Sequence, residues 1–208
     1  KVLLKTKSIG TNSDRALLLD FQATLETKPE KAIKLEKDAL AQIENITADN
    51  ARLVSNLHAN LGGLYRMNGH PDLAREHMEK SISLLDQFNL LHINDSIPQI
   101  ANYAMFLTEQ QEPERGISEL QKLSGIIKEY HSDDCLDYAK VQETLGTIYL
   151  MTANLPQAKT HFKRAFKIYE KIWADEPEMI EAKYQEIQEL YPQIGFCIGK
   201  NLSGLLTK

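Results

Sequence analysis

The 208-residue sequence has little of what marks a membrane, secreted or nucleic-acid-binding protein. Its two cysteines, Cys135 and Cys197, are too few for a disulfide framework, and free thiols favour a reducing compartment. No apolar run approaches the roughly 18 residues of a membrane span, and no signal-peptide pattern opens the chain. The 24 basic and 29 acidic residues leave a net charge of −5, which argues against a broad phosphate-facing surface. We therefore expect a cytoplasmic protein that binds neither membranes nor nucleic acids.

The residue patterns of catalysis are also missing. Segment 195–200 (Gly-Phe-Cys-Ile-Gly-Lys) contains two glycines followed by a lysine. It lacks the spacing of a phosphate-binding loop, however, and follows a predicted helix instead of a strand. Segment 131–135 (His-Ser-Asp-Asp-Cys) gathers possible metal ligands, yet no second ligand group is spaced to complete a tetrahedral site. We find no activated nucleophile and no paired carboxylates. The sequence therefore predicts no enzyme, no metal and no small-molecule cofactor.

A repeat of fixed length is the strongest feature that is present. The stretch 60–65 (Asn-Leu-Gly-Gly-Leu-Tyr) has a counterpart at 144–149 (Thr-Leu-Gly-Thr-Ile-Tyr), and 102–107 lies midway, so each step is 42 residues. A fixed period between about 20 and 50 residues is typical of a solenoid, in which each unit buries its apolar face against its neighbours. The repeat thus predicts one stacked array in place of one or two ordinary domains.

Proline spacing indicates how each unit is built. Pro29, Pro71 and Pro113 are 42 residues apart, and Pro156 lies one residue later than the next step. Proline is tolerated in the first turn of a helix, where its missing N–H has no intrahelical partner. Apolar periodicity then predicts helix pairs at 12–26 with a helix from 29, 53–67 with 71–88, 97–109 with 113–130, and 139–152 with 155–173.

These units divide the chain into three parts. Residues 1–11 are a lead-in or the end of a preceding helix. Residues 12–194 form the array, with repeats at about 12–52, 53–94, 95–136 and 137–176 and the first helix of a fifth at 177–194. Residues 195–208 are predicted to form a short C-terminal helix or cap. The sequence opens on Lys1 instead of Met, which leaves open a segment cut from a longer protein.

The residues at fixed positions of each unit resemble the tetratricopeptide repeat. The fourth copy carries Leu145-Gly146, Tyr149, Ala158, Phe162 and Ala165, which is close to that family's pattern. The family's usual unit is about 34 residues long, and a 42-residue unit looks most like the kinesin-light-chain type. The resemblance implies an all-α, right-handed superhelical solenoid of antiparallel helix hairpins, with four full repeats and a partial fifth.

Two copies depart from the family pattern. The first has Asp20 and Glu36 where the fourth has a glycine and a phenylalanine, and the third departs at Leu107 and Gly116. Elsewhere, small residues in the first helices stand opposite large apolar residues in the second helices, which lets packed helices interdigitate. The first and third copies are therefore recognised mainly by their register.

The resemblance also implies a binding surface, because the first helices of such hairpins line a concave groove. Asn60 and Asn102 lie one repeat apart, where family members use amides to hold a peptide backbone. An amide offers both a donor and an acceptor, so it can pair with an extended peptide. The alternative is that these amides only cap or solvate their helices. The candidate groove residues are Asn60, Asn102, Phe21, Asn56, Arg66, Met67, Met105, Lys140, Glu143 and Leu150.

The charged residues of this surface are Arg66 and Lys140 against Asp14, Glu143, Glu186 and Glu189, which favours a neutral, apolar or basic partner over an acidic one. The function implied is a non-catalytic scaffold that binds a peptide or partner protein in the groove. The second candidate is a regulatory segment of a larger bacterial-type regulator, in which a peptide or ligand alters an attached domain. An adjoining DNA-binding or ATPase domain would favour the second candidate.

Overall fold

A computed structural model describes residues 10–190, and all regular structure in that range is helical. The predicted cap at 195–208 and the end of the fifth first helix at 191–194 lie outside the described residues. No helix in the described part is long and apolar enough to cross a membrane. The helices are α1 (Asn12–Thr24), α2 (Pro29–Leu40), α3 (Ala51–Met67), α4 (Pro71–Gln87), α5 (Ser96–Glu109), α6 (Pro113–Tyr130), α7 (Leu136–Met151), α8 (Leu155–Ile172) and α9 (Pro177–Leu190).

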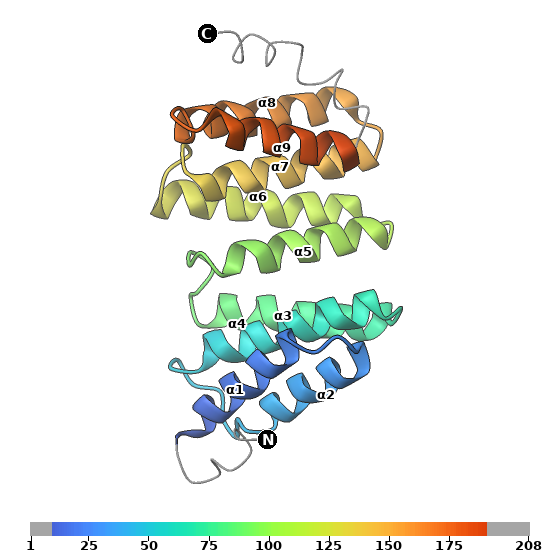
Figure 1. The fold of residues 1–208 in the computed structure, drawn as a ribbon, viewed down its shortest axis with the longest axis vertical. Helices are drawn as coiled ribbons and strands as arrows, with labels where there is room; N and C mark the ends of the chain where they lie inside the picture. Colours follow the sequence, from blue (N-terminus) through green and yellow to red (C-terminus); the bar gives the residue numbers. More distant parts are fainter. Residues whose placement is uncertain (1–9, 191–208) are drawn as a thin grey trace. The chain divides into compact units, whose positions relative to one another are not determined.

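The chain forms two compact units, one ending at Tyr103 and the other beginning at Ala104, so the boundary falls inside α5. In the first unit, α1 pairs with α2 and α3 pairs with α4, and α2 also packs against α3 (Figure 1). In the second unit, α7 pairs with α8, while α6 packs against α7 and α9 against α8. Each unit is therefore built from helix hairpins stacked on their neighbours, as the repeat predicts.

Proline lies in the first turn of the second helix of each hairpin, as expected. Pro29, Pro71 and Pro113 are the first residues of α2, α4 and α6, and Pro156 is the second residue of α8. These positions need no intrahelical N–H, so proline costs nothing there and pre-sets the backbone angle. The predicted and observed helix bounds agree to within about three residues.

The turn inside three hairpins has the same backbone shape at the same register. Gly69, Gln111 and Ala153, each 42 residues after the last, have φ angles of 74°, 66° and 58°. In each turn the next residue donates its N–H to a carbonyl near the end of the preceding helix, for example from Asn154 to Tyr149 at 2.7 Å. This left-handed position favours glycine, but only one of the three copies has it.

Pairing of small with large residues brings the two helices of a hairpin close together. A side chain added at Gly62 would place its Cβ 2.5 Å from Cγ of Met78, and one added at Gly146 would lie 2.9 Å from the ring of Phe162. Phe162 is fully buried and Met78 is 4% exposed. The predicted alternation of small and large residues is therefore confirmed in the second and fourth copies.

Candidate functional site

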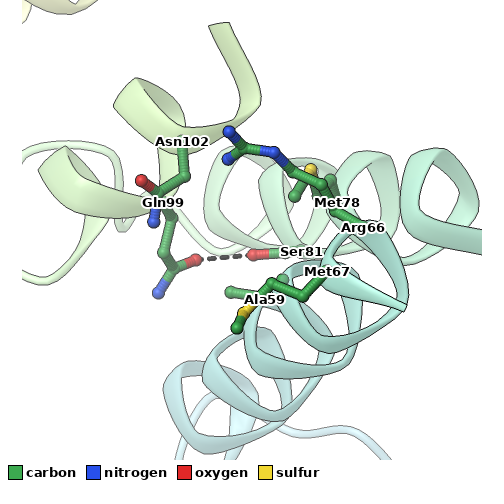
Figure 2. Close-up of a pocket in the computed structure, with 8 residues that line it drawn as sticks. Ala59, Arg66, Met67, Met78, Ser81, Gln99 and Asn102 are labelled. Carbon is green, nitrogen blue, oxygen red and sulfur yellow. Dashed lines mark hydrogen bonds between the residues drawn. The ribbon is translucent and has the colours of Figure 1, made fainter. Parts of the chain in front are cut away.

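A pocket of about 200 Å³ opens among three helices of the first unit. Figure 2 shows the two polar residues of α5, Gln99 and Asn102, on one side and Arg66 of α3 on the other. Arg66, Met67 and Asn102 were predicted as site residues. The full lining consists of Ala59, Gly63, Arg66 and Met67 from α3, Met78 and Ser81 from α4, and Gln99 and Asn102 from α5.

Hydrogen bonds hold the polar floor of this pocket in place. Oε1 of Gln99 accepts from Oγ of Ser81 at 2.5 Å and from Oγ of the buried Ser55 at 2.8 Å. Its Nε2 donates to Oδ1 of Asn56 at 2.5 Å. Gln99 is thereby fixed by both ends of its amide, and Asn56, a predicted groove residue, serves as one of its supports. Gln99 was not among the predicted site residues, although its place one helical turn before Asn102 was a usable signal.

The two most accessible groups at the pocket are Asn102 and Met67. Asn102 is exposed, and no other residue between 10 and 190 hydrogen-bonds its side chain. Met67 is 83% exposed, at the C-terminal end of α3. An amide with its donor and acceptor both open, next to a flexible apolar thioether, can bind a peptide group and an adjoining side chain.

Asn60 lies in a different setting from Asn102, although the repeat makes them equivalent. Its Nδ2 donates to Oδ1 of Asp20 at 2.8 Å and to Oε1 of Glu36 at 3.2 Å. Asn60 is half-buried, and Glu36 is only 1% exposed. The structure thus separates the two predicted amides: the Asn102 side chain is open, whereas the Asn60 donor is engaged within the unit.

Asp20 and Glu36 form a pair of carboxyl groups that the sequence analysis did not recognise. They occupy the positions filled by Gly146 and Phe162 in the fourth copy, which lie in contact there. Burial, together with the charge of Asp20 and a hydrogen bond with Asp20, raises the pKa of Glu36 to about 8, although the hydrogen bond from Asn60 opposes the rise. Glu36 is therefore mostly protonated at neutral pH. The expectation of no paired carboxylates was wrong because these residues lie 16 positions apart, on different helices.

A second polar pair, which is half-buried, lies between α3 and α4. Nδ1 of His58 and Nδ1 of His77 are 2.9 Å apart, and the His77 ring stacks on Tyr65. Burial, together with the neighbouring His77 and Lys80, lowers the pKa of His58 to about 4. The fourth copy has the same arrangement with Gln142 in the place of His58, 2.9 Å from His161. The recurrence of the contact indicates a packing element of the hairpin. Among the described residues, no three His, Cys, Asp or Glu side chains gather as a metal site requires.

The remaining predicted groove residues have varied surroundings. In the first unit, Phe21 is 59% exposed. In the second unit, Met105 and Leu150 are half-buried, and Lys140 is exposed, with Nζ 3.9 Å from Asp137.

Glu143 is engaged inside the second unit. It accepts a hydrogen bond from the Tyr169 hydroxyl at 2.5 Å, and Nζ of Lys183 lies 3.1 Å from it. Lys183 therefore already balances the negative charge of Glu143. The Glu143 carboxylate is less available to a bound partner than its repeat position predicts.

Comparison with known proteins identifies the class of fold. Residues 96–171 match the model of the tetratricopeptide repeat family. No curated protein sequence matches the chain at a significant level. Over residues 96–171 the chain resembles the tetratricopeptide-repeat family, and its fold is an all-α repeat solenoid similar to that of kinesin light chains. Proteins with this fold generally serve as interaction scaffolds.

Three solved structures support this conclusion. BtubC (BKLC) from P. vanneervenii has a TM-score of 0.64 and 20% identity over 76% of this chain, and the chain spans 62% of that protein. Two structures of nearly identical TPR-like repeats, from a Podosopora anserina protein assigned as a kinesin light chain, have TM-scores of 0.69 and 0.66. Their identities are 13% and 14%, over 83% and 82% of this chain and 84% and 83% of theirs. At these identities the likeness concerns the fold.

Proposed function

We propose that this chain is a non-catalytic interaction module that binds an extended peptide segment of a partner protein at the first-unit pocket. The observation that carries this proposal is the open amide of Asn102 at the edge of a pocket with a fixed polar floor. An exposed amide can accept from and donate to a peptide backbone without requiring a particular sequence.

The size and lining of the pocket favour a peptide side chain over a cofactor. Its volume of about 200 Å³ is below the range of roughly 300–1,000 Å³ typical of small-molecule sites. Met67 and Met78 contribute apolar, adaptable surface, and Arg66 stands at the rim. Methionine-rich contacts accommodate side chains of different shape, as a scaffold with variable partners requires.

The proposal is tested by selecting ligands from a displayed library of random linear peptides and measuring their affinity by titration calorimetry. We expect Asn102→Ala to weaken the selected peptides by about 1–2 kcal/mol, or roughly 5- to 30-fold, because a hydrogen-bonding group is lost. The matched control is Asn94→Ala, which removes another exposed amide in the same unit, away from the pocket.

Both variants should keep the wild-type melting temperature, since an exposed substitution seldom costs more than about 0.5 kcal/mol. Failure to select any peptide would contradict the proposal, and so would selected peptides that bind the Asn102 variant as tightly as wild type.

A further inference from the structure

The first hairpin departs from the others at its most closely packed point. In the second and fourth copies this point holds a glycine against a large apolar side chain, whereas the first copy holds Asp20 against Glu36. Burying a carboxyl group at a core position is costly unless a partner compensates it. Sites that break the packing rule of their own fold are candidates for function.

The chain itself supplies only part of that compensation. Asn60 donates one hydrogen bond to each carboxyl group, but Oε2 of the buried Glu36 accepts none. Among residues 10–190, no lysine or arginine forms an ion pair with either carboxyl group. The groups that face Glu36 are Asp20 from α1 and Asn60 from α3, so its neighbours provide no positive charge.

The pair is reachable from solvent through its outer members. Asp20 and Asn60 are half-buried and partly open to solvent, whereas Glu36 is fully enclosed. On α1, Leu17 and Phe21 lie three residues before and one residue after Asp20, and they are 50% and 59% exposed. Leu17 lies one helical turn before both Asp20 and Phe21 and shares a helix face with each of them, so apolar surface borders the carboxyl pair.

We infer that Asp20, Glu36 and Asn60 form a binding site for a guanidinium group, supplied by an arginine side chain of a bound peptide. A guanidinium is planar, remains charged and presents several donors, which suits a carboxylate next to an amide oxygen. Leu17 and Phe21 would cover its apolar stem, and an aromatic ring attracts the cation. That the arginine belongs to a partner peptide rests on the proposed function.

Binding should replace the proton on Glu36 with the positive charge of the guanidinium group. Without a ligand, Glu36 holds a proton that it can donate to Asp20; when the guanidinium binds, Glu36 releases this proton to the buffer and becomes a carboxylate. Because the pKa of Glu36 is about 8, the proton competes with the ligand at pH 7 and hardly at all at pH 9. The affinity should therefore rise about tenfold between these two values, while arginine stays charged throughout.

The probe is a capped pentapeptide with arginine between alanines, and its control is the same peptide with citrulline, which is similar in shape but uncharged. Calorimetry should show that the arginine peptide binds at least tenfold more tightly than the citrulline peptide, with about one proton released at pH 7. Asp20→Asn should weaken the arginine peptide about tenfold. Equal binding of the two peptides, or an affinity that does not change from pH 7 to pH 9, would overturn the inference.

A matched variant comes from the second hairpin. Asp20→Gly combined with Glu36→Met installs the residues of Gly62 and Met78, so the protein should remain folded by circular dichroism and lose binding of the arginine probe. Asn102→Ala should bind this probe as wild type does. If library peptides bind in an Asn102-dependent way while the arginine probe does not bind, this inference fails and the proposed function stands.

Discussion

Removing the Phe162 ring tests the packing of the second unit most directly. Phe162 is fully buried, and its ring lies against Gly146, which has no side chain that could move into the space. A buried aromatic side chain removes about 150–250 Å² from water, worth about 4–6 kcal/mol at about 25 cal/mol per Å². Measured phenylalanine-to-alanine changes cost about 3–5 kcal/mol, so we expect Phe162→Ala to destabilise the second unit by that amount.

The single tryptophan provides the assay. Trp173 follows α8 directly and stacks on Tyr169 with ring centroids 4.8 Å apart, so its fluorescence reports unfolding of the second unit in urea. The control is Leu155→Ala on the same helix; Leu155 is 49% exposed, and its loss should cost less than about 1 kcal/mol. Equal costs for the two variants, or a cost below about 1 kcal/mol for Phe162→Ala, would refute the packing argument.

Three further changes follow from the structure. Gly116→Ala would place its Cβ 2.6 Å from the backbone oxygen of Ala104, which cannot easily move, so thermal unfolding should show a loss of about 1–3 kcal/mol. Ala153→Gly should raise stability by up to about 1 kcal/mol in the same assay, because φ is 58° at this turn. Burial and the contact with His77 lower the pKa of His58, so wild-type stability should fall as pH drops from about 6.5 towards 4. His58→Gln should reduce this pH dependence in melting curves; an unchanged dependence would exclude His58 as its source.

The hairpin architecture was predictable because its signals are local. Pro71 and Pro113 begin helices because the proline ring fixes φ and lacks an N–H, which the first turn of a helix does not need. The fixed 42-residue step then predicts a helix start at the equivalent position of each repeat. The facing of small against large residues was also predictable, since Gly146 and Phe162 recur at fixed positions of the family pattern. These features can be predicted without knowing which side chains distant in the sequence come into contact.

The candidate site was only partly predictable, because equivalent positions acquire different neighbours. Asn60 and Asn102 share a register, yet Asp20 and Glu36 engage the donor of Asn60, while Asn102 remains open. The register did contain a signal for the carboxyl pair: Asp20 and Glu36 both replace residues that touch in the fourth copy. Two departures at positions that touch in another copy predict that Asp20 and Glu36 touch each other as well.

The sequence by itself determined the helices, their order and their repeat, because backbone preference and apolar periodicity act within one helix or one turn. Only the tertiary structure decided which polar groups are free to bind. Gln99, Ser81 and Asn56 meet on three different helices, and their hydrogen bonds depend on how those helices pack. A side chain's burial, partners and pKa are set by groups distant in the sequence, so the open amide of Asn102 and the raised pKa of Glu36 arise only when the hairpins are assembled.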